Sequence, residues 1–347
     1  MMKAAVLNGV QNIEVKDVAE PVLAEGGLVI EVATCAICGT DVKMHRYGYA
    51  AVELPLIPGH ELAGTIVQSD AVKAGYRVGD RVTVNPNIPC GTCFYCTRGL
   101  QTACDNLSII GVHRNGGFAE YVAIPGQSVK QGCVFHIPDQ VSFEEAALID
   151  PASCAVNAAE LSSIQPGDMV VIIGAGPAGC FNAEVCRARG ASKIILMQRS
   201  SRRLEKAHFT GADVFVNTSE EDAVARVLSE TDGRGADAVI IACASTEAQE
   251  QSVKMVAKRG NINLFGGLPK GSPSIQFESN LIHYKESYVT GTHGGSNRHC
   301  RIALDMISSG RIKAKQYISF SYKLADFHKA LQKAEDREGL KAFVRPE

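Results

Sequence analysis

The feature that most constrains this 347-residue chain is a regular alternation of strand-like and helix-like segments between about residues 165 and 290. The strand-like segments are 169–176, 193–198, 213–217, 237–243 and 261–267, and the helical patterns between them cover 178–189, 202–210, 221–231 and 246–258. Such alternation is typical of a parallel sheet covered by helices on both faces. We therefore expect an α/β domain with a doubly wound parallel sheet in this region.

The regions on either side have a different character. Before about residue 155, short β-rich runs at 28–35, 63–69 and 81–86 are separated by glycine and proline turns, which indicates an irregular β-rich domain. After about residue 291, helical patterns cover 298–309 and 324–334. Because 347 residues exceed what one typical hydrophobic core supports, we expect two domains.

A glycine-rich turn follows the first strand of the alternating region and opens a helix. It reads Gly174-Ala175-Gly176-Pro177-Ala178-Gly179. In this context Gly174 permits a tight turn, Gly176 lets the backbone approach a pyrophosphate, and Gly179 lets the helix pack closely on the strand. The helix N-terminus adds free N–H groups for phosphate oxygens. The turn therefore predicts a dinucleotide coenzyme site that includes Pro177 and Ala178.

The end of the second strand bears on which coenzyme binds. An acidic residue at this point would hold the ribose 2′-hydroxyl of NAD, but the strand ends at Gln198 and is followed by Arg199, Ser200, Ser201, Arg202 and Arg203. Arginine binds phosphate in bidentate fashion. We therefore favour NADP over NAD, with Arg199, Ser200 and Arg203 nearest the 2′-phosphate. The alternative is an ordinary solvated basic turn, because Gln198 can also bond a bare ribose.

Four of the twelve cysteines fall close together, at Cys90, Cys93, Cys96 and Cys104. Four thiolates at such spacing suit a closed tetrahedral zinc site that stabilises a loop without its own core. An iron–sulfur cluster is the rival, but its usual fourth cysteine comes three residues on and precedes proline. Cys180, Cys186 and Cys243 lie in apolar patterns and are expected to be buried.

A second set of metal-binding residue types is dispersed. It consists of Cys38, His60, Glu61 and Asp150. Each has an ordinary structural explanation: a buried thiol, a hydrogen-bonded histidine, or an aspartate that caps a helix. Together they offer sulfur, nitrogen and carboxylate oxygen, which is the donor set of a catalytic zinc site with one open position.

The ordered motifs resemble those of the zinc-containing medium-chain dehydrogenase/reductase family, in its sorbitol (polyol) dehydrogenase-like branch. The matching segments are Cys38-Gly39-Thr40-Asp41, Gly59-His60-Glu61, 78–82, the four cysteines, 116–121, Asp150-Pro151 and the glycine turn. The resemblance implies a GroES-like catalytic domain formed by 1–154 and 291–347, with a structural zinc lobe at about 89–107. It also implies a Rossmann coenzyme domain over 155–290 and an active site in the cleft.

The resemblance also implies individual roles. Cys38 and His60 correspond to zinc ligands, Asp150 to the third ligand position, and Glu61 to a fourth or alternate ligand. Thr40 matches the hydroxyl that relays the substrate proton, although a threonine that bonds backbone in a tight loop is the alternative. His45 is a candidate extension of that relay. Tyr47 and Phe118 are expected to line the substrate cleft.

The implied activity is oxidation of a secondary alcohol, with a polyol as the first expectation, by hydride transfer to NADP or NAD. The segment 290–296 carries no obvious arginine of the kind that many polyol dehydrogenases use. L-threonine, 2,3-butanediol, a sugar phosphate and a sugar acid therefore remain alternative substrates. A zinc-free reductase of the same superfamily, or a non-catalytic coenzyme-binding protein, would not need both sets of metal ligands.

The bulk properties bear on partners and location. A formal charge of −2 gives no basic surface for nucleic acid, and no apolar run approaches the ~20 residues of a membrane helix. The first residues show neither a secretory nor a transit pattern, so we expect a cytoplasmic protein. Family resemblance implies a homodimer or homotetramer joined near a strand-like stretch at 282–290.

Overall fold

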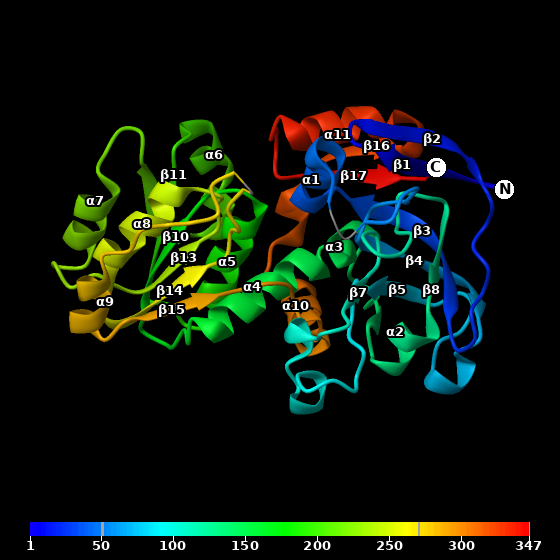
Figure 1. Ribbon diagram of the computed structural model, residues 1–347, viewed down its shortest axis with the longest axis horizontal. Coiled ribbons are helices and arrows are strands. Elements are labelled where there is room, and N and C mark those ends of the chain that lie inside the picture. The colour runs from blue at the N-terminus through cyan, green and yellow to red at the C-terminus, as the bar shows by residue number, and fades with distance from the viewer. Residues whose placement is uncertain (50–51, 270, 347) are drawn as a thin grey trace. The chain divides into compact units, whose positions relative to one another are not determined.

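The computed structural model describes residues 1–49, 52–269 and 271–346, and these divide into two compact units (Figure 1). The first unit contains Met1–Ser153, Gly294–Gly310 and Ala314–Glu347. The second contains Cys154–His293 and Arg311–Lys313. Both ends of the chain therefore belong to the first unit.

The first unit is built on a mixed sheet with the order β16-β17-β3-β4-β5-β9, in which β8 pairs with β3. Its strands are β3 (Leu28–Ala36), β4 (Glu61–Ser69), β5 (Arg81–Val84), β8 (Tyr121–Ile124), β9 (Val134–His136), β16 (Ile318–Lys323) and β17 (Lys341–Arg345). A hairpin of β1 (Met2–Gly9) and β2 (Asn12–Val18) belongs to the same unit. Fully buried aliphatic residues such as Leu28, Ile30, Leu62 and Ile66 fill the core.

Short helices border this sheet. They are α1 (Gly39–Tyr47), α2 (Gly126–Lys130), α3 (Phe143–Ala147), α10 (Asn297–Ser308) and α11 (Phe327–Glu335). A longer helix, α4 (Ile149–Leu161), begins in the first unit and continues into the second. Single 3₁₀ turns cover Val72–Ala74, Ala314–Tyr317 and Leu324–Asp326. The helix predicted for 324–334 thus begins with a 3₁₀ turn, because Asp326 leads into α11.

The cysteine-rich segment has little regular structure. Two short strands, β6 (Asn87–Ile88) and β7 (Ser108–Ile109), pair antiparallel at its base. Between them lie only the 3₁₀ turns Cys96–Arg98 and Gln101–Ala103. Because these turns bury few apolar side chains, the segment needs another source of stability.

The second unit is a parallel sheet with the strand order β12-β11-β10-β13-β14-β15. The strands are β10 (Met169–Ile173), β11 (Lys193–Gln198), β12 (Val214–Asn217), β13 (Ala236–Ile241), β14 (Val256–Leu264) and β15 (Tyr288–Gly291). Helices α5 (Pro177–Ala188), α6 (Ser201–Lys206), α7 (Ala223–Glu230), α8 (Thr246–Met255) and α9 (Ser279–Lys285) connect them (Figure 1). The expected combination of a β-rich domain and an α/β domain with a parallel sheet is thus confirmed.

Two predicted boundaries in this unit are wrong. The helix expected over 246–258 ends at Met255, where the Lys285 Nζ donates to the terminal carbonyl oxygens of Val253 and Val256 at 2.9 and 2.7 Å. The strand-like stretch expected over 282–290 is helical up to Lys285. Glu286 then adopts a left-handed conformation that ends the helix, and the strand begins at Tyr288.

None of the helices in the described ranges combines the length and the apolar character that crossing a bilayer requires.

Candidate active site and metal centres

The four cysteines of the lobe converge on one point. Cys90, Cys93, Cys96 and Cys104 place their sulfur atoms within 4.8 Å of one another. The Sγ atoms of Cys90 and Cys96 are 4.0 Å apart, and those of Cys93 and Cys104 are 3.9 Å apart. Tetrahedral zinc with Zn–S bonds of ~2.3 Å separates its sulfur ligands by roughly 3.8 Å. The thiol cluster therefore fits a closed zinc site.

Backbone groups prepare this cluster for a cation. The N–H groups of Thr92 and Cys93 lower the pKa of Cys90 to about 6, and the N–H of Cys90 lies 3.2 Å from Cys104 Sγ. Burial raises the pKa of Cys96 to about 12. Because only part of the cluster ionises by itself near neutral pH, metal binding must release protons from the remaining thiols.

The second cluster forms where β3 ends and β4 begins. In the antiparallel register of these strands, Ala36 lies opposite Glu61. Cys38 follows Ala36 by two residues and His60 precedes Glu61 by one, so the pairing brings both side chains to the same end of the sheet. The ligand atoms of Cys38, His60 and Glu61 lie within 4.8 Å of one another, and we call this group the Cys38–His60–Glu61 cluster.

Asp41 lies beside two members of this cluster. One carboxylate oxygen accepts the Cys38 backbone N–H at 2.8 Å, and the other lies 3.5 Å from His60 Nδ1. Burial disfavours the charged form of His60, but the Asp41 charge, together with Cys38, raises the pKa of His60 well above its usual range. Among the described residues, neither His60 Nδ1 nor Asp41 Oδ1 has a hydrogen-bond partner, so the two atoms do not form a hydrogen bond with each other.

Glu61 is held by a cation from the far end of the chain. The Lys341 Nζ donates to both carboxylate oxygens of Glu61, to Oε2 at 2.6 Å, and it also lies 3.3 Å from the Ile37 carbonyl oxygen. The side chains of Lys341 and Glu61 are 5% and 0% exposed. Desolvation opposes the charge on Lys341, but Glu61 outweighs it and raises the Lys341 pKa. The lysine was not found from the sequence, since nothing near it marks a site.

Asp150 lies beside the cluster rather than within its closest group. It stands in the first turn of α4, is 8% exposed, and receives a 3.4 Å hydrogen bond from Asn87 Nδ2 at one carboxylate oxygen. Burial raises the Asp150 pKa to about 6, whereas the nearby charge of His60 lowers it. Among the described residues, the group within 4.8 Å comprises Cys38, His60 and Glu61 but not Asp150.

The residue types in this arrangement fit a zinc ion. The donor atoms are one thiol sulfur, one imidazole nitrogen and carboxylate oxygens, which is the mixed set found at catalytic zinc rather than at closed tetrathiolate sites. Thr40 belongs to the same loop, with its hydroxyl oxygen 3.8 Å from Cys38 Sγ. The Thr40 hydroxyl thus lies next to the Cys38 thiol.

Of the other residues expected near the substrate, Phe118 is placed in the core, whereas Tyr47 and His45 lie on α1. Phe118 has no exposed surface and packs edge-on against Phe327 at 4.9 Å, so it belongs to the core and offers no surface to a substrate. Tyr47 is 75% exposed at the end of α1. His45 places Nδ1 3.0 Å from Glu335, and Arg46 donates to the other oxygen of that carboxylate at 3.1 Å. The last turn of α1 is therefore anchored to α11.

The glycine turn of the second unit has the geometry that its sequence predicts. Gly174 has φ +115°, and a Cβ on Gly179 would lie 1.6 Å from the Gly174 carbonyl oxygen. Gly176 is the N-cap of α5, Pro177 is its first residue, and a Cβ built on Gly176 meets nothing closer than Arg203 Nη1 at 3.8 Å. The turn thus leaves space for phosphate groups and places a guanidinium beside it.

The residues expected to choose the coenzyme surround the end of β11. Gln198 Oε1 accepts the Arg199 backbone N–H at 2.8 Å, and Ser219 Oγ donates to the Arg199 carbonyl oxygen at 3.0 Å. Arg199 and Ser200 are exposed, and Ser200 caps α6. A neutral amide therefore stands at the strand end, followed by Arg199, while Arg203 lies beside the glycine turn.

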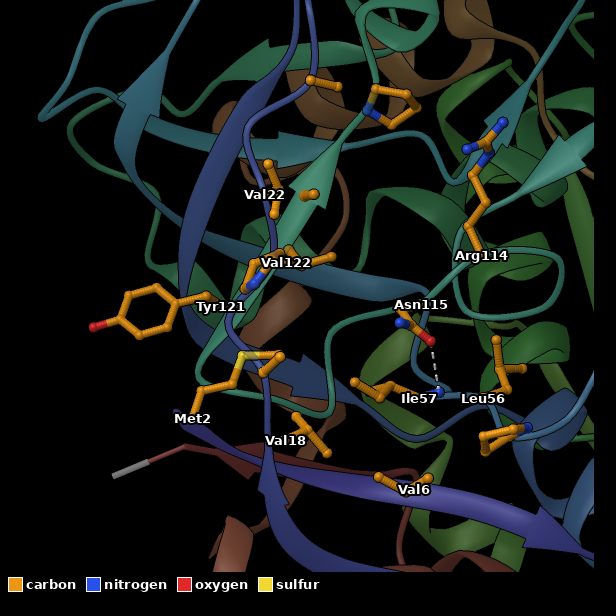
Figure 2. A pocket seen from close by; sticks show the side chains of 16 residues that line it. Met2, Val6, Val18, Val22, Leu56, Ile57, Arg114, Asn115, Tyr121 and Val122 are labelled. Carbon is orange, nitrogen blue, oxygen red and sulfur yellow. Dashed lines mark hydrogen bonds between the residues drawn. The ribbon is translucent and has the colours of Figure 1, made fainter.

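A surface cavity of the first unit does not coincide with either metal cluster. It has a volume of about 510 Å³ and is mostly apolar. Figure 2 shows Met2, Val6, Val18 and Val122 around it, with Asn115 accepting the Ile57 backbone N–H at 3.0 Å. None of its lining residues is a candidate metal ligand, so this cavity does not locate the chemistry.

Comparison with known proteins identifies the class. Residues 24–139 match the alcohol dehydrogenase GroES-like domain, and residues 177–309 match the zinc-binding dehydrogenase domain. Sorbitol dehydrogenase of Bacillus subtilis is 32% identical over 99% of this chain and 97% of its own length. L-threonine 3-dehydrogenase of Pyrococcus abyssi is 35% identical over 93% of this chain and 91% of its own.

A solved structure agrees with these relatives. A zinc-binding dehydrogenase from Sinorhizobium meliloti, bound to NADP, superposes with a TM-score of 0.92 at 31% identity and covers 100% of this chain and 99% of its own. The chain therefore belongs to the zinc-type alcohol dehydrogenase family and is an oxidoreductase.

Proposed function

We propose that this protein is a zinc-dependent dehydrogenase that oxidises a secondary alcohol, in the first instance a polyol, to a ketone and catalyses the reverse reaction. The observation that carries the proposal is the Cys38–His60–Glu61 cluster with Asp150 beside it, in a chain that matches sorbitol dehydrogenases over nearly its whole length. A protein that only bound the coenzyme would have no use for this mixed donor set in addition to the lobe.

The proposed chemistry divides between bound groups and the chain's own residues. Zinc supplies Lewis acidity that lowers the pKa of the substrate hydroxyl, and the nicotinamide coenzyme accepts the hydride. The Asp41 charge acts on the His60 ring, Lys341 balances the Glu61 charge, and the Thr40 hydroxyl accepts the alcohol proton and passes it toward solvent. The reaction thus removes one hydride and one proton from the alcohol, which becomes the ketone.

We also propose that NADP is preferred over NAD. Gln198 carries no charge to repel a 2′-phosphate, and Arg199, Ser200 and Arg203 supply donors near it. Replacing Gln198 by Asp is expected to shift the ratio of kcat/KM values toward NAD by about 10- to 100-fold, as a charged hydrogen bond to ribose of about 1.5–3 kcal/mol would do. A wild-type enzyme with higher kcat/KM for NAD would contradict the preference.

The substrate is tested with a panel of polyols, polyol phosphates, sugar acids, L-threonine and 2,3-butanediol, each with both coenzymes. The proposal expects a polyol to have the highest kcat/KM. L-threonine is the second candidate because its dehydrogenase is as similar to this chain as the sorbitol enzyme is. Highest turnover with L-threonine would replace the polyol, whereas no turnover of any alcohol by zinc-loaded protein would contradict a dehydrogenase.

We propose a homodimer or homotetramer formed through the edge strand β15. Tyr288 and Val289 on this strand are 55% and 40% exposed, and an uncovered apolar edge favours pairing with a second copy. Thiolate ligands also favour a reducing compartment such as the cytoplasm. Light scattering of the purified protein tests the assembly, and a monomer at micromolar concentration would contradict it.

A further inference from the structure

A hydrogen-bonded network of amide side chains, which we call the amide network, connects Asp150 to segments far away in the sequence. Asn87 Nδ2 donates to Asp150 Oδ1 at 3.4 Å and lies 3.1 Å from Asn85 Oδ1. Asn85 Nδ2 in turn donates to Asn297 Oδ1 at 2.8 Å and to the Gly295 carbonyl oxygen at 3.2 Å. The amide network thus joins the Asp150 carboxylate, the base of the four-cysteine lobe and the first residues of α10.

Hydrogen bonds, several of them with backbone groups, give each side-chain amide of the network a single orientation. Asn85 Oδ1 accepts the Asn87 backbone N–H at 3.0 Å, so its amino group must face Asn297. Asn297 Nδ2 donates to the Gln131 carbonyl oxygen at 2.6 Å, so its oxygen must face Asn85. With Asn85 Oδ1 and Asp150 Oδ1 both acceptors, only the amino group of Asn87 can lie between them.

The side chains of the amide network are also fixed in position. Asn85 is 1% exposed, and Asn87 belongs to β6, whose pairing with β7 forms the base of the lobe. The Asn297 backbone N–H donates to Gln101 Oε1 at 3.1 Å, and Gln101 lies in the lobe itself. The main chain of Asp150 is also fixed, because Ser153 Oγ donates to its carbonyl oxygen at 2.7 Å. Asn87 thus contacts the carboxylate of Asp150, while Ser153 fixes its main chain.

We propose that Asn87 is a positioning residue that holds the Asp150 carboxylate toward the Cys38–His60–Glu61 cluster, and that Asn85 and Asn297 lock Asn87 in the orientation this requires. The inference rests on the proposed function, in which that cluster and Asp150 bind zinc. Asp150 is close enough to His60 and Glu61 for their charges to act on it, while its hydrogen bond to Asn87 fixes one oxygen. Because the two oxygens of the carboxylate have a fixed geometry, holding Oδ1 also limits where Oδ2 can point.

The alternative role for the amide network is to attach α10 to the lobe. In that case the loss of Asn87 would lower the overall stability or loosen both metal sites equally. A positioning role instead predicts a selective effect on the Cys38–His60–Glu61 cluster, because partners that orient metal ligands typically contribute 10- to 100-fold to metal affinity.

The test compares the zinc-loaded full chain with three variants. Asn87→Ala removes the donor to Asp150, and Asn297→Ala leaves the donor but removes its lock at the first position of α10, where alanine is well accepted. Asn106→Ala is the matched control, since Asn106 is an exposed asparagine of the same lobe. The readouts are zinc affinity by chelator competition, the visible spectrum after cobalt(II) substitution, and the melting temperature.

The proposal expects Asn87→Ala to weaken zinc at the Cys38–His60–Glu61 cluster by about 10- to 100-fold and to change the cobalt bands of that site. The tetrathiolate cobalt bands should stay as in wild type. Asn297→Ala should show a smaller loss of the same kind, and Asn106→Ala none. This graded, selective pattern supports positioning even if Asn87→Ala proves hard to purify, because Asn297→Ala alone must then show the selective loss.

Two kinds of result would overturn the inference, and they are distinguishable. Wild-type affinity and cobalt spectrum in both Asn87→Ala and Asn297→Ala, or an equal weakening of both metal sites, would overturn the positioning role while leaving the proposed function intact. A wild-type chain that binds zinc at the lobe alone would overturn the proposed function, and the positioning role with it.

Discussion

The four-cysteine lobe and the Cys38–His60–Glu61 cluster belong to the same unit but are assembled in opposite ways. The lobe draws all its ligands from residues 90–104, and its own backbone N–H groups contact their sulfur atoms. The second cluster draws on the ends of two strands, and its charges are balanced by a lysine 280 residues away in the sequence.

The comparison shows how two metal sites in one domain serve different ends. The lobe has four soft thiol ligands and little regular structure beyond the short β6–β7 pair and two 3₁₀ turns, so we expect a metal there to take the place of a core. The Cys38–His60–Glu61 cluster rests on a packed sheet and has mixed ligands, so under the proposed function we expect a metal there to be dispensable for folding and to act on the substrate. Four variants sharpen or break this division.

The largest effect is expected from Cys38→Ala. Loss of this ligand should reduce kcat/KM at least about 10⁴-fold, because polarisation of a substrate oxygen contributes several kcal/mol and each ~1.4 kcal/mol is tenfold in rate. Zinc content should fall by about one ion per chain while the lobe stays loaded. Cys186→Ala, which removes a buried thiol from α5, is the control. Turnover within tenfold of wild type would break the division.

Cys96→Ala tests the lobe in the same way. The variant should lower the free energy of unfolding of the zinc-loaded chain by about 5 kcal/mol, since loss of a structural metal belongs to the most destabilising changes. Urea denaturation followed by circular dichroism measures this. Asn106→Ala, in the same lobe, should change stability by less than about 0.5 kcal/mol. A Cys96→Ala variant as stable as wild type would mean that the lobe needs no metal.

Lys341→Met probes the charge balance of the Cys38–His60–Glu61 cluster. In zinc-free protein it should cost about 3 kcal/mol of stability, because Glu61 is left as an uncompensated buried charge. In zinc-loaded protein the cost relative to wild type should be smaller, since the cation compensates Glu61. Lys329→Met, from an exposed pair with Asp326, should leave the stability of both states close to that of wild type. Equal costs of Lys341→Met with and without zinc would place Glu61 out of reach of the metal.

Glu335→Gln gives the smallest effect and depends on pH. Burial tends to raise the Glu335 pKa, but the hydrogen bonds from Arg46 and His45 outweigh it and lower the pKa. The folded pKa therefore lies below the unfolded value of about 4.3, and the carboxylate stabilises the fold above that pH. The variant should lose about 1–2 kcal/mol at pH 7, and the difference should disappear as the pH falls through the folded pKa. Unfolding curves from pH 7 to pH 3 measure this, and a pH-independent difference would contradict the ion pair.

The two sites also differ in how far the sequence predicts them. Spacing alone predicts the lobe, because ligands within fifteen residues can meet without knowledge of the fold. The glycine turn is similarly local, and Gly174 and Gly179 make the close approach that their spacing implies. Cys38 and His60 could be grouped from their donor types and from resemblance to a family, but spacing could not show that they meet, because the register of β3 and β4 brings them together.

What the sequence did not reveal are the partners that hold those ligands. Lys341 and Asn87 look like ordinary surface lysine and turn asparagine in the sequence, and only the strand pairing and the lobe base place them at the site. Phe118 shows the reverse case. An aromatic residue in a family motif was expected at the substrate, but it contacts Phe327 in the core. The sequence also placed the end of α8 too late and the start of β14 too late. The contacts of Lys285 with the carbonyl oxygens of Val253 and Val256 at this junction are tertiary and leave no local signal.

The central claim is that the chain holds two metal ions in two chemically different sites. Anomalous diffraction at the zinc edge, from crystals of the zinc-loaded protein, tests this most directly. The account predicts one peak among the Sγ atoms of Cys90, Cys93, Cys96 and Cys104 and a second bounded by Cys38 Sγ, a ring nitrogen of His60 and a carboxylate of Glu61 or Asp150. A single peak at the lobe, with the Lys341–Glu61 ion pair intact and no density at Cys38, would contradict it.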